Sequence, residues 1–549
     1  MNNQRDYNYY EAHEADVTLE EITSCERNKR ILRWLRGGRD KDMDISFPYQ
    51  IRLYLGNING SCFIDFALSE CNDLGWLGYF IGKSKRHFQL SIIGSPETQG
   101  GEQRIIHALC DGITRNQSIC KISLSNLSND GFVTIARVLG NLTQLKRLAV
   151  SNCVDNDNTL VTLLESGVKL KKLSLHNGVA TFAHGLRSIG SSLEELDLSG
   201  NNVGNDGLLV LAAALADCTS IKTLYLYDND LSMAAAGLGA LSGWLQTSGI
   251  QLQALNLYRC GINDEGLQAL IEGAVNHCSY LNLASNRRIT ASGLRFLSTA
   301  LQSERCYVEN LDITDTAIDD DAAELFARAL VGNRTLRSLY LAGGEDEEYD
   351  MPITPAGWSA FSIALCDTSS VNNTYLSHHT ISELWNIYID DEDEPQNLTR
   401  YLRLNQRYPQ HAAKCKILMS HAHLDMTPLL KWELKFLPLA VNWFERAKPC
   451  TALSFGQNRI LEESDEVFES RILTALYDFV RGAPKKVLER RDELTLVAAY
   501  DDKIALVELE KKRLHDEVEK LRREIVQLDK GNMRLRGIVE SVKKTVDSY

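Results

Sequence analysis

The sequence lacks several features that would identify common classes of protein. Proline is scarce, with 10 residues in 549, which argues against long proline-rich linkers. Lys and Arg number 59 against 73 Asp and Glu, a net charge of −14, so binding to nucleic acid through bulk positive charge is not expected. No stretch approaches 18 uninterrupted apolar residues, and the acidic start has no apolar signal-peptide core. We therefore expect no membrane span and a cytoplasmic or nuclear protein.

Disulfide, metal and catalytic motifs are also missing. The 13 cysteines are odd in number and form no CxxC pair, which favours reduced, buried cysteines over a disulfide framework or a structural zinc site. There is no G-x-S-x-G, no H-E-x-x-H and no phosphate-binding G-x-x-x-x-G-K-[ST] motif. We predict that the chain has no cofactor, no metal and no catalytic residue, and that it is not an enzyme.

Two histidine pairs are the remaining candidates for chemistry. His378 and His379 are expected at the end of the last strand, and His421 and His423 in a C-terminal cap. Each pair lacks the third ligand and the second shell that zinc needs, so surface or capping roles are favoured. Two acidic runs lie at residues 345–350 and 390–394. They lack the spacing and glycine of a calcium loop, which favours solvated segments.

A repeated apolar motif dominates the middle of the chain. The pattern L-x-x-L-x-L-x-x-(N/C)-x-L has clear copies that begin at Leu193, Ile221 and Leu252. Weaker copies begin at Ile119, Leu145, Leu170, Cys278, Val308 and Leu336. Degenerate copies begin at His87 and Val371, which gives about eleven units with a mean length of about 28 residues.

Each copy predicts a short strand, a turn and a helix. Positions four and six, such as Leu196 and Leu198, point to the same side of a strand because side chains alternate. Position nine is asparagine or cysteine in five copies: Asn201, Asn229, Asn286, Cys153 and Cys260. An inward amide there can hydrogen-bond backbone groups that would otherwise be buried unsatisfied. The segment after the strand, such as residues 207–215, spaces its apolar residues as a helix does.

A strand and a full helix in every unit of this length predict a strongly curved α/β horseshoe, with strands inside and helices outside. In these repeats the sequence resembles the ribonuclease-inhibitor-type subfamily of leucine-rich-repeat proteins. The repeat regions of NOD-like receptors and of Ran GTPase-activating proteins belong to the same type. The resemblance covers about residues 85–385. It implies the fold and leaves the partner unspecified.

The rest of the chain predicts three further regions. Residues 1–84 are expected to be a helical N-terminal cap or lead-in and residues 386–482 a C-terminal cap, because the ends of a solenoid need covering. Residues 483–549 are expected to form a coiled coil. The predicted fold class is therefore α/β, a curved leucine-rich-repeat solenoid over residues 85–385 with helical caps and a long C-terminal coiled-coil helix.

The coiled-coil prediction depends on a heptad repeat. Its seam alternates apolar positions over about four heptads: Leu514, Val518, Leu521, Ile525, Leu528, Asn532, Leu535 and Val539. Leucine at d with β-branched residues and one asparagine at a favours a parallel pair of helices. A homodimer is favoured, while pairing with another coiled-coil protein and a single helix packed on its own solenoid stay open. The acidic segment upstream excludes a basic DNA-binding region.

The outward positions of the strands form the predicted concave face. Early copies offer basic residues: Lys121, Lys146, Arg147, Lys171 and Lys172. Later copies offer Tyr225, Tyr227, Asp228, Tyr258, Arg259, Tyr280 and Tyr340. Tyr and Arg are enriched at binding hot spots, so we predict a protein partner here. The alternatives are that the tyrosines follow β-propensity and that the lysines are solvated surface.

These features predict a non-enzymatic protein–protein interaction scaffold, with a concave face that binds a partner and a coiled coil that mediates dimerisation. The alternative is a GTPase-activating protein that resembles the Ran-directed family. That family has an acidic C-terminal tail, whereas this chain ends in a charged coiled coil, and no residue matches a catalytic-support role. A third hypothesis is an immune-type or cytoskeletal sensor, which would need a separate ATPase subunit because the chain has no P-loop motif.

Overall fold

The structure, a computed structural model, describes residues 7–37, 50–54, 65–66, 72–86, 88–94, 102–153, 158–176, 183–341, 353–385, 398–407, 409 and 412–421. The chain divides into two units, residues 1–416 and 417–549, and nearly all described residues belong to the first. Several predicted features lie outside the described residues: the coiled-coil seam at 514–539, the histidine at 423, most of the cap beyond 421 and both acidic runs.

The described residues of the first unit contain one sheet of 13 strands, and its strands pair in parallel. The strands are β1 (Gln50–Tyr54), β2 (Asp65–Phe66), β3 (Phe88–Ile93), β4 (Ile119–Ser125), β5 (Arg147–Ser151), β6 (Lys172–His176), β7 (Glu195–Asp197), β8 (Thr223–Tyr225), β9 (Leu252–Asn256), β10 (Cys278–Asn282), β11 (Asn310–Asp312), β12 (Ser338–Tyr340) and β13 (Glu383–Trp385). From β3 to β13 each strand pairs with the next in chain order, whereas β1 pairs with β3 and places β2 at the edge.

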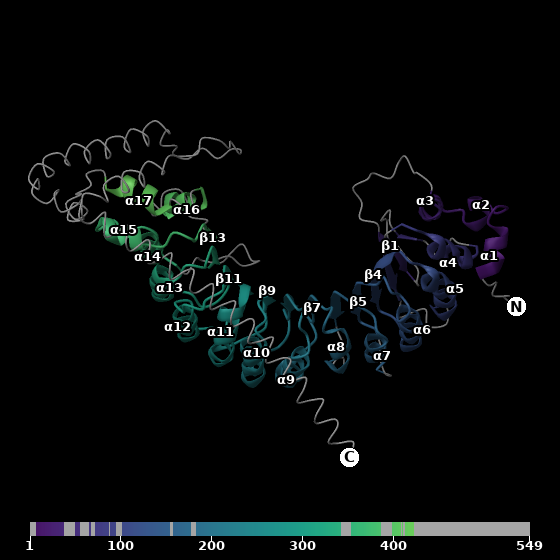
Figure 1. Ribbon diagram of the computed structural model, residues 1–549, viewed down its shortest axis with the longest axis horizontal. Coiled ribbons are helices and arrows are strands. Elements are labelled where there is room, and N and C mark those ends of the chain that lie inside the picture. Colours follow the sequence, from purple (N-terminus) through teal and green to yellow (C-terminus); the bar gives the residue numbers. More distant parts are fainter. Residues whose placement is uncertain are drawn as a thin grey trace, which may run out of the picture. The chain divides into compact units, whose positions relative to one another are not determined.

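Helices connect the strands and lie on the outer side of the curved sheet, while the strands line its inner side (Figure 1). Parallel neighbours need such a crossover connection. The helices are α1 (Tyr7–His13), α2 (Leu19–Ile22), α3 (Glu26–Leu35), α4 (Leu74–Lys83), α5 (Glu102–Arg115), α6 (Asn129–Leu139), α7 (Thr159–Glu165), α8 (Ala183–Ile189), α9 (Gly204–Leu215), α10 (Ala235–Ser248), α11 (Asp264–His277), α12 (Ala291–Ala300), α13 (Asp320–Gly332), α14 (Pro355–Leu365), α15 (Val371–Leu376), α16 (Leu398–Arg407) and α17 (Ala412–Ser420).

A ladder of apolar residues joins twelve of these strands through the core. The strand register aligns Ile51, Leu90, Ile122, Leu148, Leu173, Leu196, Leu224, Leu255, Leu281, Leu311, Leu339 and Leu384. Leu255 at the centre is 0% exposed. The rungs from Leu90 to Leu339 are position four of their copies, and Ile51 and Leu384 extend the ladder beyond them. One buried apolar residue covers the next, and no single unit could bury its own face. The predicted curved leucine-rich-repeat solenoid is confirmed.

The outer helices pack closely where glycine allows it. A Cβ added to Gly273 on α11 would lie 2.6 Å from the carbonyl oxygen of Ser242 on α10. The backbones of the two helices therefore touch at this point, and the Ser242 hydroxyl accepts a hydrogen bond from the Gly273 amide at 3.0 Å. Such contacts set the spacing of neighbouring units on the helical side.

Two sequence predictions about secondary structure need correction. The copy predicted to begin at Val371 is a helix, α15, because the Ser370 hydroxyl caps it by accepting the Asn373 amide at 3.1 Å. The last strand is instead β13, in which Leu384 is buried, as is Ile381 just before it. The segment 1–84, predicted to be helical, contains α1 to α4 but also β1 and β2, so the sheet begins before the first recognised repeat.

No helix in the described part of the chain is both long enough and apolar enough to span a bilayer.

Candidate functional site: the concave wall

Positions three and five of each strand point away from the buried leucines, and we call the surface they form the concave wall. Strand register aligns position three as Lys121, Arg147, Lys172, Glu195, Thr223, Ala254, Tyr280, Asn310, Ser338 and Glu383. It aligns position five as Ser123, Ala149, Ser174, Asp197, Tyr225, Asn256, Asn282, Asp312 and Tyr340. The wall is therefore a continuous two-row surface of mainly polar, charged and aromatic side chains, with alanine at residues 149 and 254.

The predicted binding residues occupy three different places. Those on the concave wall itself are Lys121, Arg147, Lys172, Tyr225, Tyr280 and Tyr340. Those directly before β5 and β6 are Lys146 and Lys171, which are exposed. Those in the turns after β8 and β9 are Tyr227, Asp228, Tyr258 and Arg259. The structure thus separates the predicted tyrosine–arginine cluster into a part on the wall and a part along the rim.

The rim residues sit in turns with an unusual backbone. Asp228 and Arg259 have φ of 55° and 56°, in the left-handed region that most side chains avoid. The same turn position holds Asn126 and Asn152 in earlier copies, with φ of 54° and 52°, and asparagine tolerates this region well. Arg259 Nε lies 3.6 Å from a carboxylate oxygen of Asp228. These two predicted binding residues therefore neutralise each other.

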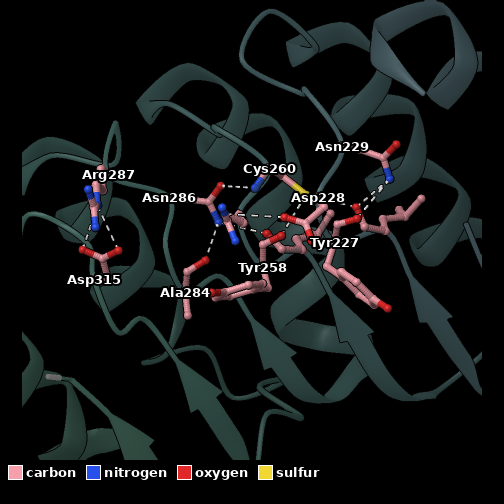
Figure 2. Close-up of polar contacts among 12 residues, drawn as sticks. Tyr227, Asp228, Asn229, Tyr258, Cys260, Ala284, Asn286, Arg287 and Asp315 are labelled. Carbon is pink, nitrogen blue, oxygen red and sulfur yellow. Dashed lines mark hydrogen bonds and ion pairs between the residues drawn. The ribbon is translucent and has the colours of Figure 1, made fainter. Parts of the chain in front are cut away.

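Beneath these turns the position-nine asparagines link each repeat to the one before it (Figure 2). Asn286 is fully buried. Its side-chain oxygen accepts the amides of Cys260 at 3.1 Å and Ile262 at 2.9 Å. Its side-chain nitrogen donates to the carbonyls of Leu257 at 2.9 Å and Leu283 at 2.7 Å. The inward hydrogen bonding predicted for this position is confirmed, and it fixes the rim of the concave wall.

Asn229 repeats this arrangement two units earlier, in the pair formed with Asn201. Its side-chain oxygen accepts the amides of Asn201 and Val203, both at 3.0 Å. Its side-chain nitrogen donates to the carbonyl of Leu226 at 2.8 Å. In the cysteine version of this slot, the Cys260 thiol donates to the same Leu226 carbonyl at 3.1 Å, so the small, weakly polar substitute also satisfies the turn.

The basic end of the site divides into paired and unpaired cations. Glu194 binds both Lys171 and Lys222, and these lysines lower the pKa of its carboxyl to about 2. Lys172 pairs with Glu195 on the next strand. A second set of cations on or beside β4 and β5 forms no ion pair with any residue that the structure describes: Lys121, Lys146 and Arg147. Among the described residues, this second set is the unpaired positive charge on the concave wall and directly beside it.

Ser174, His176 and Asp197 come together where the basic end finishes. The Ser174 hydroxyl donates to Asp197 at 2.8 Å, and His176 Nε2 lies 3.4 Å from the same carboxylate oxygen. His176 Nδ1 donates to the carbonyl of Ser199 at 2.9 Å. A nucleophilic relay needs the serine and the aspartate on opposite nitrogens of the imidazole, whereas here both lie at Nε2. The arrangement is an ion-pair network and not a catalytic triad.

His176 and Asp197 shift each other's pKa values. Burial opposes ionisation of Asp197, but hydrogen bonds from His176 and Ser199 outweigh it and bring the pKa of Asp197 to about 2. The hydrogen bond to Asp197 raises the pKa of His176 above its ordinary value, against the opposing effect of burial. When it is protonated, the imidazole compensates the Asp197 charge, as Lys172 compensates Glu195 beside it.

An aromatic and acidic end follows on β10 to β12. Asp312 is aligned with Asn282 on β10 and with Tyr340 on β12. Burial raises the pKa of Asp312 despite hydrogen bonds from Thr314, and no cation that the structure describes forms an ion pair with it. Burial is the main cause that raises the pKa of Tyr280, and the charge of Asp312 raises it further.

The residues that sequence reasoning missed at this site are mainly acidic: Glu195, Asp197, Asp312 and Glu383. They lie at the same outward positions as the predicted tyrosines and lysines, so the alignment of the repeats could have identified them. Their role depends on neighbours in adjacent strands, more than 20 residues away in sequence, as in the pairing of Lys172 with Glu195.

The histidine pair predicted at the end of the last strand lies instead before β13, in the packing between units. His378 is fully buried. Its Nδ1 lies 2.7 Å from the carbonyl of Leu330 and its Nε2 lies 2.8 Å from the Thr380 hydroxyl. Lys416 donates to the carbonyls of Leu365 at 2.7 Å and His378 at 2.9 Å. The side chains of His378 and Lys416 thus hydrogen-bond backbone carbonyls near the end of the sheet.

Comparison with known proteins agrees with this geometry. The family described as "Leucine Rich repeat" matches residues 191–212 and 251–270, which hold β7 and β9 with parts of the following helices. The chain carries leucine-rich repeats. NACHT, LRR and PYD domains-containing protein 14 of Mus musculus is 27% identical over 281 residues, which are 51% of this chain and 25% of that protein. The ribonuclease inhibitor of Mus musculus is 26% identical over 251 residues, 43% of this chain and 54% of the inhibitor.

The chain therefore spans about a quarter to a half of the length of these relatives. The solved structure of leucine-rich repeat-containing protein LegL7 from Legionella pneumophila is 14% identical, with a TM-score of 0.35, and covers 64% of this chain and 97% of its own. Proteins with leucine-rich repeats generally mediate protein–protein interactions, a role that suits an open surface such as the concave wall.

Proposed function

We propose that this protein is a non-enzymatic scaffold that binds a protein partner on its concave wall and dimerises through residues 483–549. One observation carries the first part. The position-three row of the concave wall runs across ten neighbouring strands, β4 to β13, and the position-five row across nine, β4 to β12; no element of the described residues covers them. A surface of this extent suits a protein partner better than a small ligand, which would need an enclosing cavity.

The chemistry of the wall supports the same conclusion. Tyr225, Tyr280 and Tyr340 are each partly exposed, and strand register aligns Tyr225 with Asp197 and Tyr340 with Asp312. Such side chains combine apolar area with a polar tip and lose little conformational entropy on binding. The rim residues Tyr227 and Tyr258 extend this surface past the strands, and we include them in the proposed interface.

Affinity capture with matched variants tests the binding surface. Full-length protein and the variant Tyr225→Ala/Tyr280→Ala/Tyr340→Ala are used as bait in the same lysate, with a control that truncates exposed residues on the helical side, Val210→Ala/Phe296→Ala/Ile363→Ala. We expect specific partners to be lost from the concave variant and retained by the helical control. Retention of every partner by the concave variant would reject the concave wall as the interface.

Dimerisation rests on the heptad sequence alone. Leucine at four successive d positions with asparagine at one a position is the pattern of a parallel two-stranded coiled coil. We expect Leu521→Asp/Leu528→Asp in the full chain to give a monomer at micromolar concentration in light scattering. The control is Arg523→Asp, at the outward f position of the same heptad, which should leave the dimer intact. A wild-type chain that is already monomeric would reject a homodimer.

A further inference from the structure

The free charges of the concave wall are separated by sign. The unpaired cations Lys121, Lys146 and Arg147 lie on or beside β4 and β5, whereas Asp312 lies on β11 without a cationic partner among the described residues. The strands between them carry charges that compensate one another, such as Lys172 with Glu195. The wall therefore has a positive end, a neutral middle and a negative end.

The negative end is also the aromatic one. The Tyr280 hydroxyl accepts a hydrogen bond from the Asn282 side chain at 3.1 Å, which restrains the phenol. Strand register aligns Tyr340 on β12 with Asp312 on β11, and Tyr280 lies on β10, which pairs with β11 on its other side, so tyrosines on both neighbouring strands flank Asp312. A carboxylate flanked by aromatic rings binds a guanidinium or an ammonium group through both an ion pair and a cation–π contact.

The positive end has a different chemistry. Lys146 and Arg147 are exposed and Lys121 is partly exposed, and Arg147 lies between Lys121 and Lys172 in the strand register. Adjacent cations without counter-ions repel one another and are stabilised when a carboxylate approaches. This end therefore fits acidic side chains of a partner.

From these observations we infer that the concave wall binds a dipolar protein segment, with acidic residues over Lys121, Lys146 and Arg147 and a basic residue between Tyr280, Asp312 and Tyr340. This inference rests on the proposed scaffold function and names the chemistry of its partner. It also fixes the orientation of that partner, because the reverse placement would oppose like charges at both ends.

The spacing of the two ends sets the length of the segment. Six strand steps separate β5 from β11, and neighbouring strands lie about 4.8 Å apart, so the two ends are about 29 Å apart along the sheet. An extended chain covers about 3.3 Å per residue, so about nine residues bridge the two ends. A segment with clusters of opposite charge at this separation can engage both ends at once, which raises its affinity through effective concentration.

The test uses labelled synthetic peptides and the full-length protein in fluorescence anisotropy at low and at moderate salt. The dipolar probe has four Glu and four Arg separated by nine Gly and Ser residues. The control probe has the same composition with Glu and Arg alternating. We expect the dipolar probe to bind about tenfold more tightly or better, with Arg147→Glu and Asp312→Asn each removing most of that advantage. The matched controls on the helical side, Arg295→Glu and Glu272→Gln, should change nothing.

Equal affinity for the two probes, no binding of either, or equal losses in the helical-side controls would overturn the inference. The scaffold proposal has a separate readout, since the tyrosine variant tests partner capture without reference to charge order. Partners lost from the tyrosine variant together with equal probe affinities would reject the dipolar segment and retain the concave interface. Retained partners would reject both.

Discussion

Replacing Asn286 by alanine should destabilise the central repeats strongly, and the size of the effect follows from its hydrogen bonds. The side chain is fully buried and bonds two backbone amides, of Cys260 and Ile262, and two backbone carbonyls, of Leu257 and Leu283. Each hydrogen bond is worth about 1 kcal/mol net, and a backbone group left unsatisfied in the core costs about as much or more. We expect a loss of about 4 kcal/mol in the free energy of unfolding.

Asn256→Ala is the matched control. Asn256 is partly exposed on the concave wall, and its side-chain oxygen accepts one amide, that of Tyr258, at 2.9 Å. Its loss should cost about 1 kcal/mol. Chemical denaturation measures both variants, and hydrogen exchange at the Cys260 and Ile262 amides reports the local effect, since repeat arrays need not unfold as one unit. Equal costs in the two variants, or unchanged exchange at these amides, would refute the ladder as the link between repeats.

Three further changes test the packing and the electrostatics. Leu255→Ala, in the centre of the leucine ladder at 0% exposure, should cost about 2–5 kcal/mol in chemical denaturation; a cost below 1 kcal/mol would contradict the continuous core. Gly273→Ala should destabilise by about 1–3 kcal/mol because its Cβ would meet α10, whereas Gly243→Ala, with open space around it, should be neutral or stabilising. Because the pKa of His176 is raised in the folded state, its contribution is full below about pH 6.5 and is lost as pH rises through the folded value. His176→Gln should abolish this loss, which is less than about 1 kcal/mol for a partly exposed pair, and an unchanged pH profile of thermal stability would count against the ion pair.

The sequence predicted the core because burial imposes a strict spacing on leucine. Position four of each copy had to face the same way and meet the next copy, and the register aligns Leu196, Leu224 and Leu255 as expected. The strands at the start of the sheet escaped prediction. β1 (Gln50–Tyr54) and β2 (Asp65–Phe66) precede any copy of the motif, so repetition gave no signal there.

The candidate site was predicted less completely, because it depends on contacts across strands. The outward positions correctly identified Tyr225 and Tyr280 on the wall. Arg259 and Asp228 were also predicted to bind a partner, but they pair with each other, so neither adds unpaired charge to the surface. The sequence did indicate that these two residues lie in turns, because other copies hold asparagine at the same position. The neutralisation of Lys172 by Glu195 is likewise invisible along the chain, since the partners meet only through strand register.

Photo-crosslinking tests the central claim that partners bind the concave wall. A benzoylphenylalanine replaces Tyr225 or Tyr280 on the wall, or Phe296 on the outer helix α12, in otherwise native full-length protein. We predict covalent adducts with the captured partner from the two wall positions and none from α12. Adducts from Phe296 alone would contradict the account and place recognition on the helical side.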